Sequence, residues 1–130
     1  MKHYYFAFYG NDLLLERQDD GTYSIPYREE PPTATDGKMA MLDVAYADGT
    51  TAKTYRLDSP ETGDGRLELC GLRKSYYKLT YELYVKAGKC EELLYWDSHN
   101  RYCGICGSKM EKHTDISKKC VKCGNEVWPQ

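Results

Sequence analysis

Short apolar segments separated by turn residues fill roughly the first half of the chain and predict β-strands. The aromatic run at 4–9 ends at a Gly-Asn turn and is followed by the apolar segment 13–15. Pro26 favours a strand end or an edge strand, and Asp48-Gly49 between two apolar segments indicates a hairpin. We expect about five or six strands, at 4–9, 13–15, 23–27, 39–47, 51–57 and 67–70.

After Gly71 the apolar spacing changes to three and four, which is typical of one face of a helix. This stripe predicts a helix from 72 to about 97, formed by Tyr76, Leu79, Leu83, Ala87, Cys90 and Leu94. Gly88 interrupts it at a cost near 1 kcal/mol, so a broken helix pair also fits the pattern. The fold class we expect is α+β, with a β-rich domain at 1–71, a helical connector at 72–100 and a cysteine-rich module at 101–130.

Four cysteines near the carboxyl end form two C-x-x-C pairs, Cys103 with Cys106 and Cys120 with Cys123. Two residues between thiols let both sulfurs of a tight turn point at one ion, and the glycine after each pair relieves the backbone there. Two such pairs complete a tetrahedral shell with no open position for water. The spacing therefore predicts a structural zinc ribbon, while a redox pair or a rubredoxin-type iron site are the alternatives.

The remaining cysteines, Cys70 and Cys90, are isolated in apolar surroundings, and we expect them to be buried, inert thiols. Zinc matters for a module of this size because about thirty residues cannot build a self-sufficient core. Zinc binding contributes roughly 10 to 16 kcal/mol in such modules. We expect removal of the metal to unfold this end of the chain.

Composition and charge narrow the class of protein. With 41% hydrophobic and 29% charged residues, the chain resembles a soluble folded protein, and it has neither a membrane-spanning apolar run nor a signal-peptide pattern. We therefore expect a cytoplasmic protein with no membrane partner. Residues 1–71 carry 13 acids and 7 bases, whereas 101–130 carry 3 acids and 6 bases. Four thiolates on one zinc would reduce the basic excess of the ribbon to about +1, which is not typical of a patch that wraps polyphosphate.

The segment around the first cysteine pair resembles a known family. The stretch 92–107, ELLYWDSHNRYCGICG, followed by the second pair and by Val127-Trp128-Pro129-Gln130, resembles the junction region of the NADH pyrophosphatases of the Nudix superfamily. In that family a helix ending in a tryptophan and a histidine leads into a zinc ribbon, and an aromatic-Pro-Gln step then enters the catalytic domain. The resemblance implies a small Nudix-like β-rich domain at the amino end.

This resemblance also implies an activity for the parent enzyme, which is metal-assisted hydrolysis of the NAD(H) diphosphate to nicotinamide mononucleotide and AMP, and of NAD-capped RNA. The Nudix signature, G-x5-E-x7-R-E-x-x-E-E-x-G, holds the catalytic Mg or Mn, and it does not occur in this chain. We therefore expect the amino-terminal and zinc-ribbon part of such an enzyme, from a truncated or split protein, that is inactive by itself.

The resemblance implies three substrate contacts in the part of the enzyme represented here. Trp128 takes the place of an aromatic residue that stacks on the nucleotide, Asp115 that of an acid before the third cysteine, and Arg73 that of an arginine before the helix. Each has a plainer interpretation: Trp128 covers the apolar side of the ribbon, Asp115 is a solvated loop acid, and Arg73 is a surface residue at a helix start. The family also implies a homodimer.

Two other functions fit the residues. A freestanding zinc-ribbon adaptor would bind protein or RNA through its lysines, Lys109, Lys112, Lys118, Lys119 and Lys122, although such charges usually form a solvated face. A purely structural module, whose β-rich domain serves folding or oligomerisation, is compatible with every feature above.

Overall fold

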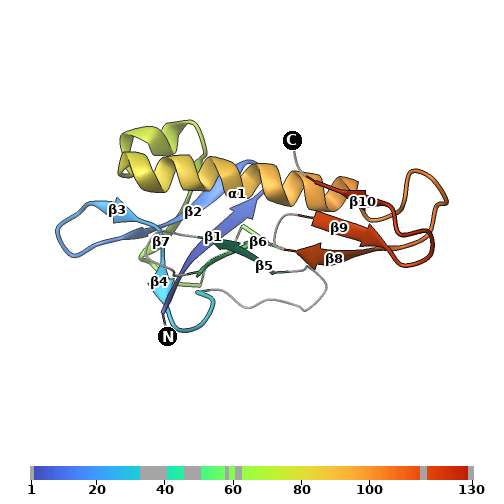
Figure 1. Cartoon of the computed structure of the whole chain (residues 1–130). Coiled ribbons are helices and arrows are strands. Elements are labelled where there is room, and N and C mark those ends of the chain that lie inside the picture. Colours follow the sequence, from blue (N-terminus) through green and yellow to red (C-terminus); the bar gives the residue numbers. More distant parts are fainter. Residues whose placement is uncertain are drawn as a thin grey trace. The chain divides into compact units, whose positions relative to one another are not determined.

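The computed structural model of the chain describes residues 2–32, 41–45, 51–57, 59–60, 63–114 and 117–128. The chain divides into two compact units, Met1–Glu91 and Glu92–Gln130, and each is described by itself. The first unit is a sheet with the first part of a helix, and the second continues from that helix into a smaller sheet (Figure 1). The four cysteines belong to the second unit. The expected α+β class is therefore confirmed.

The first unit is built on a seven-stranded mixed sheet in the described part of the chain. Its strands are β1 (His3–Tyr9), β2 (Asp12–Arg17), β3 (Tyr23–Ser24), β4 (Tyr27–Arg28), β5 (Leu42–Ala45), β6 (Thr51–Arg56) and β7 (Leu67–Gly71). The main order is β3-β2-β1-β6-β5, with β4 pairing with β1 and β7 with β2. At its centre β1 and β6 are parallel, while the other pairs are antiparallel.

Pro26 explains why the segment expected as one strand at 23–27 forms two. β3 pairs with β2, where Ser24 lies opposite Glu16, whereas β4 pairs with β1, where Tyr27 lies opposite Tyr4. Between them the carbonyl of Pro26 accepts a hydrogen bond from the amide of Tyr5 at 2.9 Å. Proline has no amide hydrogen to donate to a ladder, so it lies where the chain passes from one strand partner to the next.

The expected hairpin after the first loop is present as an antiparallel pair. β5 and β6 are in register from Leu42 opposite Thr54 to Ala45 opposite Thr51. The turn residues Asp48 and Gly49 lie outside the described residues. Because β1 and β6 run in the same direction, the chain between them must return to the end of the sheet at which β1 begins.

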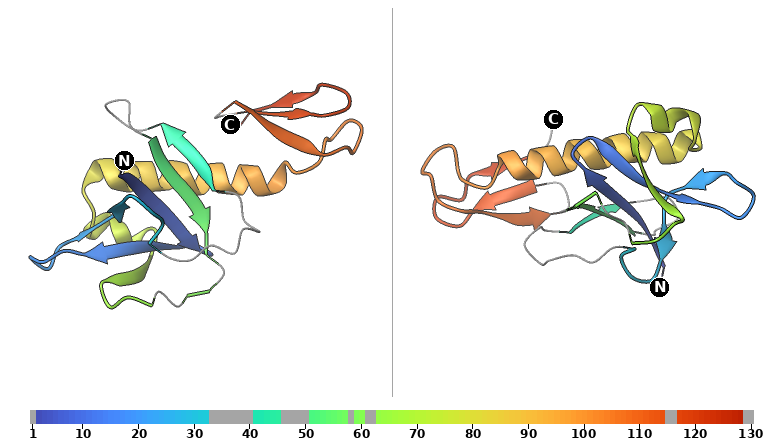
Figure 2. Two further views of the ribbon diagram at one scale, coloured as in Figure 1. Left: turned by 90° about the horizontal axis from the view of Figure 1, so that it is seen from below. Right: turned by 180° about the vertical axis from the view of Figure 1, so that it is seen from behind.

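Both faces of the sheet are buried. One face carries Tyr5, Ala7, Leu14, Tyr55 and Leu67, which form a cluster at most 5% exposed. The residues that alternate with them, including Phe6, Phe8 and Thr54, point to the opposite face and are fully buried. The first half of α1 (Tyr81–His99) covers that opposite face, as Figure 2 shows from two sides.

An ion pair ties α1 to the sheet. Both terminal nitrogens of Arg56 donate to the carboxylate of Glu91, at 2.9 and 3.0 Å, and one of them also reaches the carbonyl of Gly10 at 2.8 Å. The side chains of Arg56 and Glu91 are both about one-fifth exposed. This contact joins β6, the β1–β2 turn and the helix within the first unit.

The helix begins nine residues later than the apolar stripe predicts. A short 3₁₀ turn, η2 (Lys74–Tyr77), comes first, and α1 starts at Tyr81 after Thr80, whose hydroxyl accepts from the amide of Leu83 at 3.4 Å. Threonine satisfies an otherwise unpaired amide of the first turn, so the boundary falls there. The helix then runs through Gly88 without a break.

The stripe itself is largely confirmed, since Leu79, Leu83, Ala87, Cys90 and Leu94 are all buried. Tyr76 is the exception because it lies in η2 and is 52% exposed. Within the described residues, no helix has the length and apolar character needed to span a bilayer.

The second unit begins inside α1 and continues into a three-stranded antiparallel sheet. Its strands are β8 (Met110–Thr114), β9 (Ser117–Cys120) and β10 (Glu126–Val127), in the order β10-β9-β8. Among the described residues of this unit, a small core cluster is formed by Cys103, Met110 and Cys120, with Val127 packed against them. Two of these four residues are cysteines of the predicted metal site, so apolar packing alone contributes little to the stability of this unit.

Candidate metal centre

The first cysteine pair lies in a tight turn between α1 and β8. The amide of Cys103 donates to the carbonyl of Ser108 at 2.7 Å, and the amide of Gly107 donates to the carbonyl of Cys103 at 2.9 Å. Gly107 has a φ of 75°, a conformation that side chains with a Cβ rarely adopt. The glycine after the pair is thus needed for the turn, as the spacing predicts.

The second pair repeats this turn after β9. The amide of Cys120 donates to the carbonyl of Asn125 at 2.7 Å, and the amide of Gly124 donates to the carbonyl of Cys120 at 3.2 Å. Gly124 has a φ of 79°. Two segments with the same C-x-x-C-G pattern therefore form equivalent turns, and each carries two thiols on one side.

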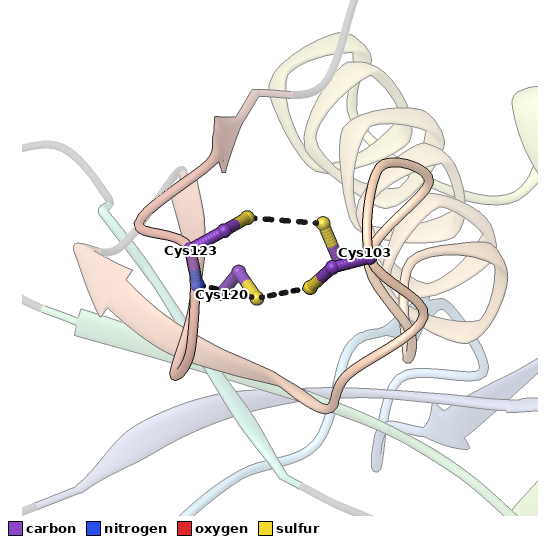
Figure 3. Close-up of side chains that lie close together, drawn as sticks. Cys103, Cys120 and Cys123 are labelled. Carbon is purple, nitrogen blue, oxygen red and sulfur yellow. Dashed lines mark hydrogen bonds between the residues drawn. The ribbon is translucent and has the colours of Figure 1, made fainter.

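The four sulfur atoms meet between the two turns. Sγ of Cys103 lies 3.6 Å from Sγ of Cys123, and Sγ of Cys106 lies 3.4 Å from Sγ of Cys120 (Figure 3). All four lie within 4.8 Å of one another. A tetrahedral zinc ion with Zn–S bonds of about 2.3 Å separates its sulfurs by about 3.8 Å. The donor set and its spacing therefore fit a four-thiolate metal ion.

Backbone amides favour thiolates at this cluster. The amide of Ile105 lies 3.3 Å from the sulfur of Cys103, and the amide of Lys122 lies 3.4 Å from that of Cys120. Hydrogen bonds from the amides of Cys106 and Ile105 lower the pKa of Cys103 to about 6. This is the environment that a cation-binding sulfur requires, because the ligand is the deprotonated form.

The other thiols show the effect of crowding. The side chain and amide of Ser108 lower the pKa of Cys106. The amide of Asn125 favours the thiolate of Cys123, but burial and three neighbouring sulfurs outweigh it and raise its pKa to about 11. Sulfurs so close cannot all be negative without a positive charge among them, and a divalent metal ion would supply that charge.

Lys118 anchors β9 to the end of α1. Its ammonium donates to the Asp97 carboxylate at 2.7 Å and to the carbonyls of Asp97 and Asn100 at 2.8 and 3.3 Å. It also lies 5.7 Å from the centre of the Trp96 ring, and the residue is 7% exposed. A cation at the carboxyl end of a helix is favoured by the helix dipole and by unpaired carbonyls.

Lys118 is one of the five ribbon lysines named above as binding residues of an adaptor. Its burial differs from that expectation. Its neighbour Lys119 is exposed and lies opposite Glu111 on one side and Glu126 on the other. Residues opposite one another in a sheet point to the same face, so Lys119 stands in a row with two acids. These two lysines are therefore poorly suited to a basic binding face, whereas the other three, Lys109, Lys112 and Lys122, are exposed.

The predicted substrate residues fall in different parts of the chain. Arg73 is exposed in the first unit and lines a cavity of about 540 Å³ together with Asn11, Asp12, Gly71, Leu72 and Lys74. Trp128 follows β10 in the second unit and is 54% exposed, so its ring is accessible. Asp115 lies outside the described residues.

The fold and the cysteine cluster define an α+β protein with four cysteines placed so that they could hold a metal ion. Residues 2–96, which are most of the chain, match the family model described as the NADH pyrophosphatase-like rudimentary NUDIX domain. The chain belongs to this family. No curated protein sequence matches it.

Proposed function

We propose that the four cysteines hold one zinc ion with a structural role. The support is the set of four sulfurs within 4.8 Å of one another, with amides directed at two of them. Zinc would link the two turns, and a shell of four protein ligands leaves no position for a reacting water. An iron ion would use the same donors, so the metal is tested directly by elemental analysis of the purified chain. One zinc per chain is expected, and stoichiometric iron would contradict the proposal.

For the whole protein we propose that this chain is the amino-terminal and zinc-ribbon portion of a Nudix NADH pyrophosphatase. The observation that carries this is the family match over residues 2–96, followed directly by the cysteine cluster. In this proposal a Nudix catalytic domain, with its Mg or Mn, supplies the hydrolysis of NAD(H), and of NAD-capped RNA as a further substrate. The present chain supplies structure, a homodimer contact and part of the substrate site, in the cytoplasm.

Within this function, Trp128 would stack on the substrate's nucleotide, and Arg73 and Asp115 would bind its polar groups. An exposed indole offers a flat face to a base. The exposed guanidinium of Arg73 beside a cavity is suited to a phosphate. Trp128 allows a sharper test than Arg73 or Asp115, because one substitution can remove its aromatic ring and another can keep a smaller ring.

The test uses the protein encoded by the complete reading frame. We expect Trp128→Ala to weaken NADH binding by about 1 to 3 kcal/mol, whereas Trp128→Phe keeps a π face and retains most of it. Steady-state hydrolysis of NADH measures both variants. Unchanged KM and kcat in Trp128→Ala would show that the tryptophan only covers the ribbon. A reading frame that encodes no Nudix domain, with no separate Nudix partner, would contradict the enzyme assignment.

A ribbon adaptor that binds protein or RNA is the second candidate, and the three exposed lysines, Lys109, Lys112 and Lys122, are what favours it. Its test is salt-dependent RNA binding that disappears when these three are replaced by glutamine. The burial of Lys118 and the two acids beside Lys119 weaken this candidate relative to the enzyme portion.

A further inference from the structure

The segment before α1 has a composition unlike the rest of its unit. Residues 72–81, LRKSYYKLTY, contain three bases, three tyrosines and no acid. In contrast, residues 1–71 contain 13 acids and 7 bases. A basic, tyrosine-rich segment on an acidic unit is not explained by packing, because most of these side chains are exposed.

The three tyrosines of this segment are exposed, and two of them are in ring contact. Tyr77 is 86% exposed and Tyr81 is 72% exposed. Tyr76 meets Tyr77 edge to face, with ring centres 5.3 Å apart, and meets Tyr84 of α1 in the same way at 5.3 Å. Tyr76 therefore braces η2 against the helix, and binding at Tyr77 costs less ordering than binding at an unsupported side chain.

Three cations, Arg73, Lys74 and Lys78, belong to the same segment as these rings. Within the described residues, Arg73 and Lys74 have no acidic partner within salt-bridge distance, and both are exposed. The ammonium of Lys78 lies 4.7 Å from the centre of the Tyr23 ring, and the nearby Glu68 carboxylate raises the pKa of Tyr23. Lys78 is thus held over an aromatic face, with one acid nearby.

We propose that this tyrosine surface, formed by Lys74, Tyr76, Tyr77, Lys78 and Tyr81, binds single-stranded nucleic acid. Exposed aromatic rings stack on unpaired bases without regard to sequence, and adjacent cations pair with the phosphates. An acidic peptide would use the cations but has no need of several exposed π faces, so the combination favours a strand with bases. Duplexes hide their base faces and are excluded from this mode.

Binding of a nucleic-acid strand is a different function from the hydrolysis of a dinucleotide proposed above, and it does not depend on that hydrolysis. A bare strand without any cap is the ligand. Loss of strand binding would leave NADH hydrolysis as a separate question, and loss of hydrolysis would leave strand binding testable.

The experiment measures fluorescence anisotropy of a short labelled oligoadenylate with the zinc-loaded chain, at several salt concentrations. We expect Tyr77→Ala and Tyr81→Ala each to weaken binding about fivefold or more. Replacing Lys74 and Lys78 with glutamine reduces the log-log slope of affinity against salt by about 0.7 for each phosphate that no longer pairs with a cation. The matched controls are Tyr95→Ala and Lys89→Gln, an exposed tyrosine and a lysine elsewhere on α1, which leave binding unchanged.

Two competitors separate the surface from other modes of binding. The same strand annealed to its complement should compete poorly, and polyglutamate should compete only through charge. Equal binding of RNA and DNA strands supports the proposal, since no part of it uses the 2′-hydroxyl. No binding at low salt, full binding by the tyrosine variants, or stronger competition by the duplex or by polyglutamate would each overturn it.

Discussion

Two cysteines, Cys70 and Cys90, lie outside the sulfur cluster and in the first unit. Cys70 and Cys90 were expected to be buried thiols, and they are 8% and 0% exposed. Burial raises the pKa of Cys90 to about 12, and it outweighs the contact with Thr54, which lowers this pKa. A thiol with so little thiolate is a poor nucleophile, so we expect Cys90, on the buried face of α1, to be unreactive.

The raised pKa of Cys90 makes stability depend on alkaline pH. The folded chain keeps a proton that the unfolded chain releases above its ordinary pKa of 9.0. The contribution to the free energy of unfolding is therefore complete below about pH 9. It falls by up to about 1.4 kcal/mol per pH unit until the folded pKa is reached.

Cys90→Ala removes this dependence while leaving the tyrosines in place. We expect the wild type to lose roughly 1 kcal/mol more than the variant between about pH 9 and about pH 10. Urea unfolding followed by far-UV circular dichroism measures both. Parallel pH profiles would show that the thiol does not titrate as its burial requires.

At the scale of elements, the end of α1 in the second unit depends on Lys118. Lys118→Met keeps the buried stem but leaves the Asp97 carboxylate and two carbonyls without their partner. We expect a loss of about 2 to 3 kcal/mol, below that of a fully buried pair because the Asp97 side chain is 24% exposed. Denaturant unfolding followed by tryptophan fluorescence measures it, since Trp96 is adjacent to the ammonium.

The control is Lys122→Met at an exposed position of the second turn, which we expect to change the free energy of unfolding by less than about 0.5 kcal/mol. Equal effects of the two substitutions would contradict the anchoring role.

In the first unit, the contact between helix and sheet depends on Arg56. We expect Arg56→Met to cost about 2 kcal/mol, because Glu91 and the Gly10 carbonyl lose their donor. Arg56→Lys keeps the charge but not the two parallel hydrogen bonds, so its free energy of unfolding should lie between those of the wild type and Arg56→Met. Adding Glu91→Gln to Arg56→Met should cost less than the sum of the two single effects, as measured in a double-mutant cycle of unfolding free energies.

How far the sequence predicts these elements depends on the range of the interactions. Strands and the helical stripe follow from local periodicity, and the cysteine turns follow from spacing and glycines such as Gly107. The parallel pairing of β1 with β6 and the burial of Lys118 involve residues far apart in the chain, so local periodicity does not predict them. The late start of α1 could have been read from Thr80, a favourable helix cap within the apolar stripe.

At the scale of the whole molecule, the two units are stabilised by different means. The first has a sheet buried on both faces, whereas the core cluster of the second, in the part of the chain that the structure describes, has four residues of which two are cysteines. A core this small is insufficient for a module of about forty residues. The sulfur cluster therefore has to supply much of the stability of the second unit.

Removal of the metal should consequently unfold one unit and spare the other. Both tryptophans, Trp96 and Trp128, belong to the second unit, so their fluorescence reports on the ribbon alone. We expect a strong zinc chelator to give unfolded-like tryptophan emission, because zinc contributes roughly 10 to 16 kcal/mol in such modules. Amide hydrogens of β1 and β6 should remain protected from exchange, since their core contains no cysteine of the cluster. The matched variant is Cys120→Ser, which removes one ligand and should reproduce the chelator's effect, with Cys70→Ser as the control outside the cluster. Tryptophan emission that stays unchanged after complete zinc removal would show that the ribbon folds without its metal.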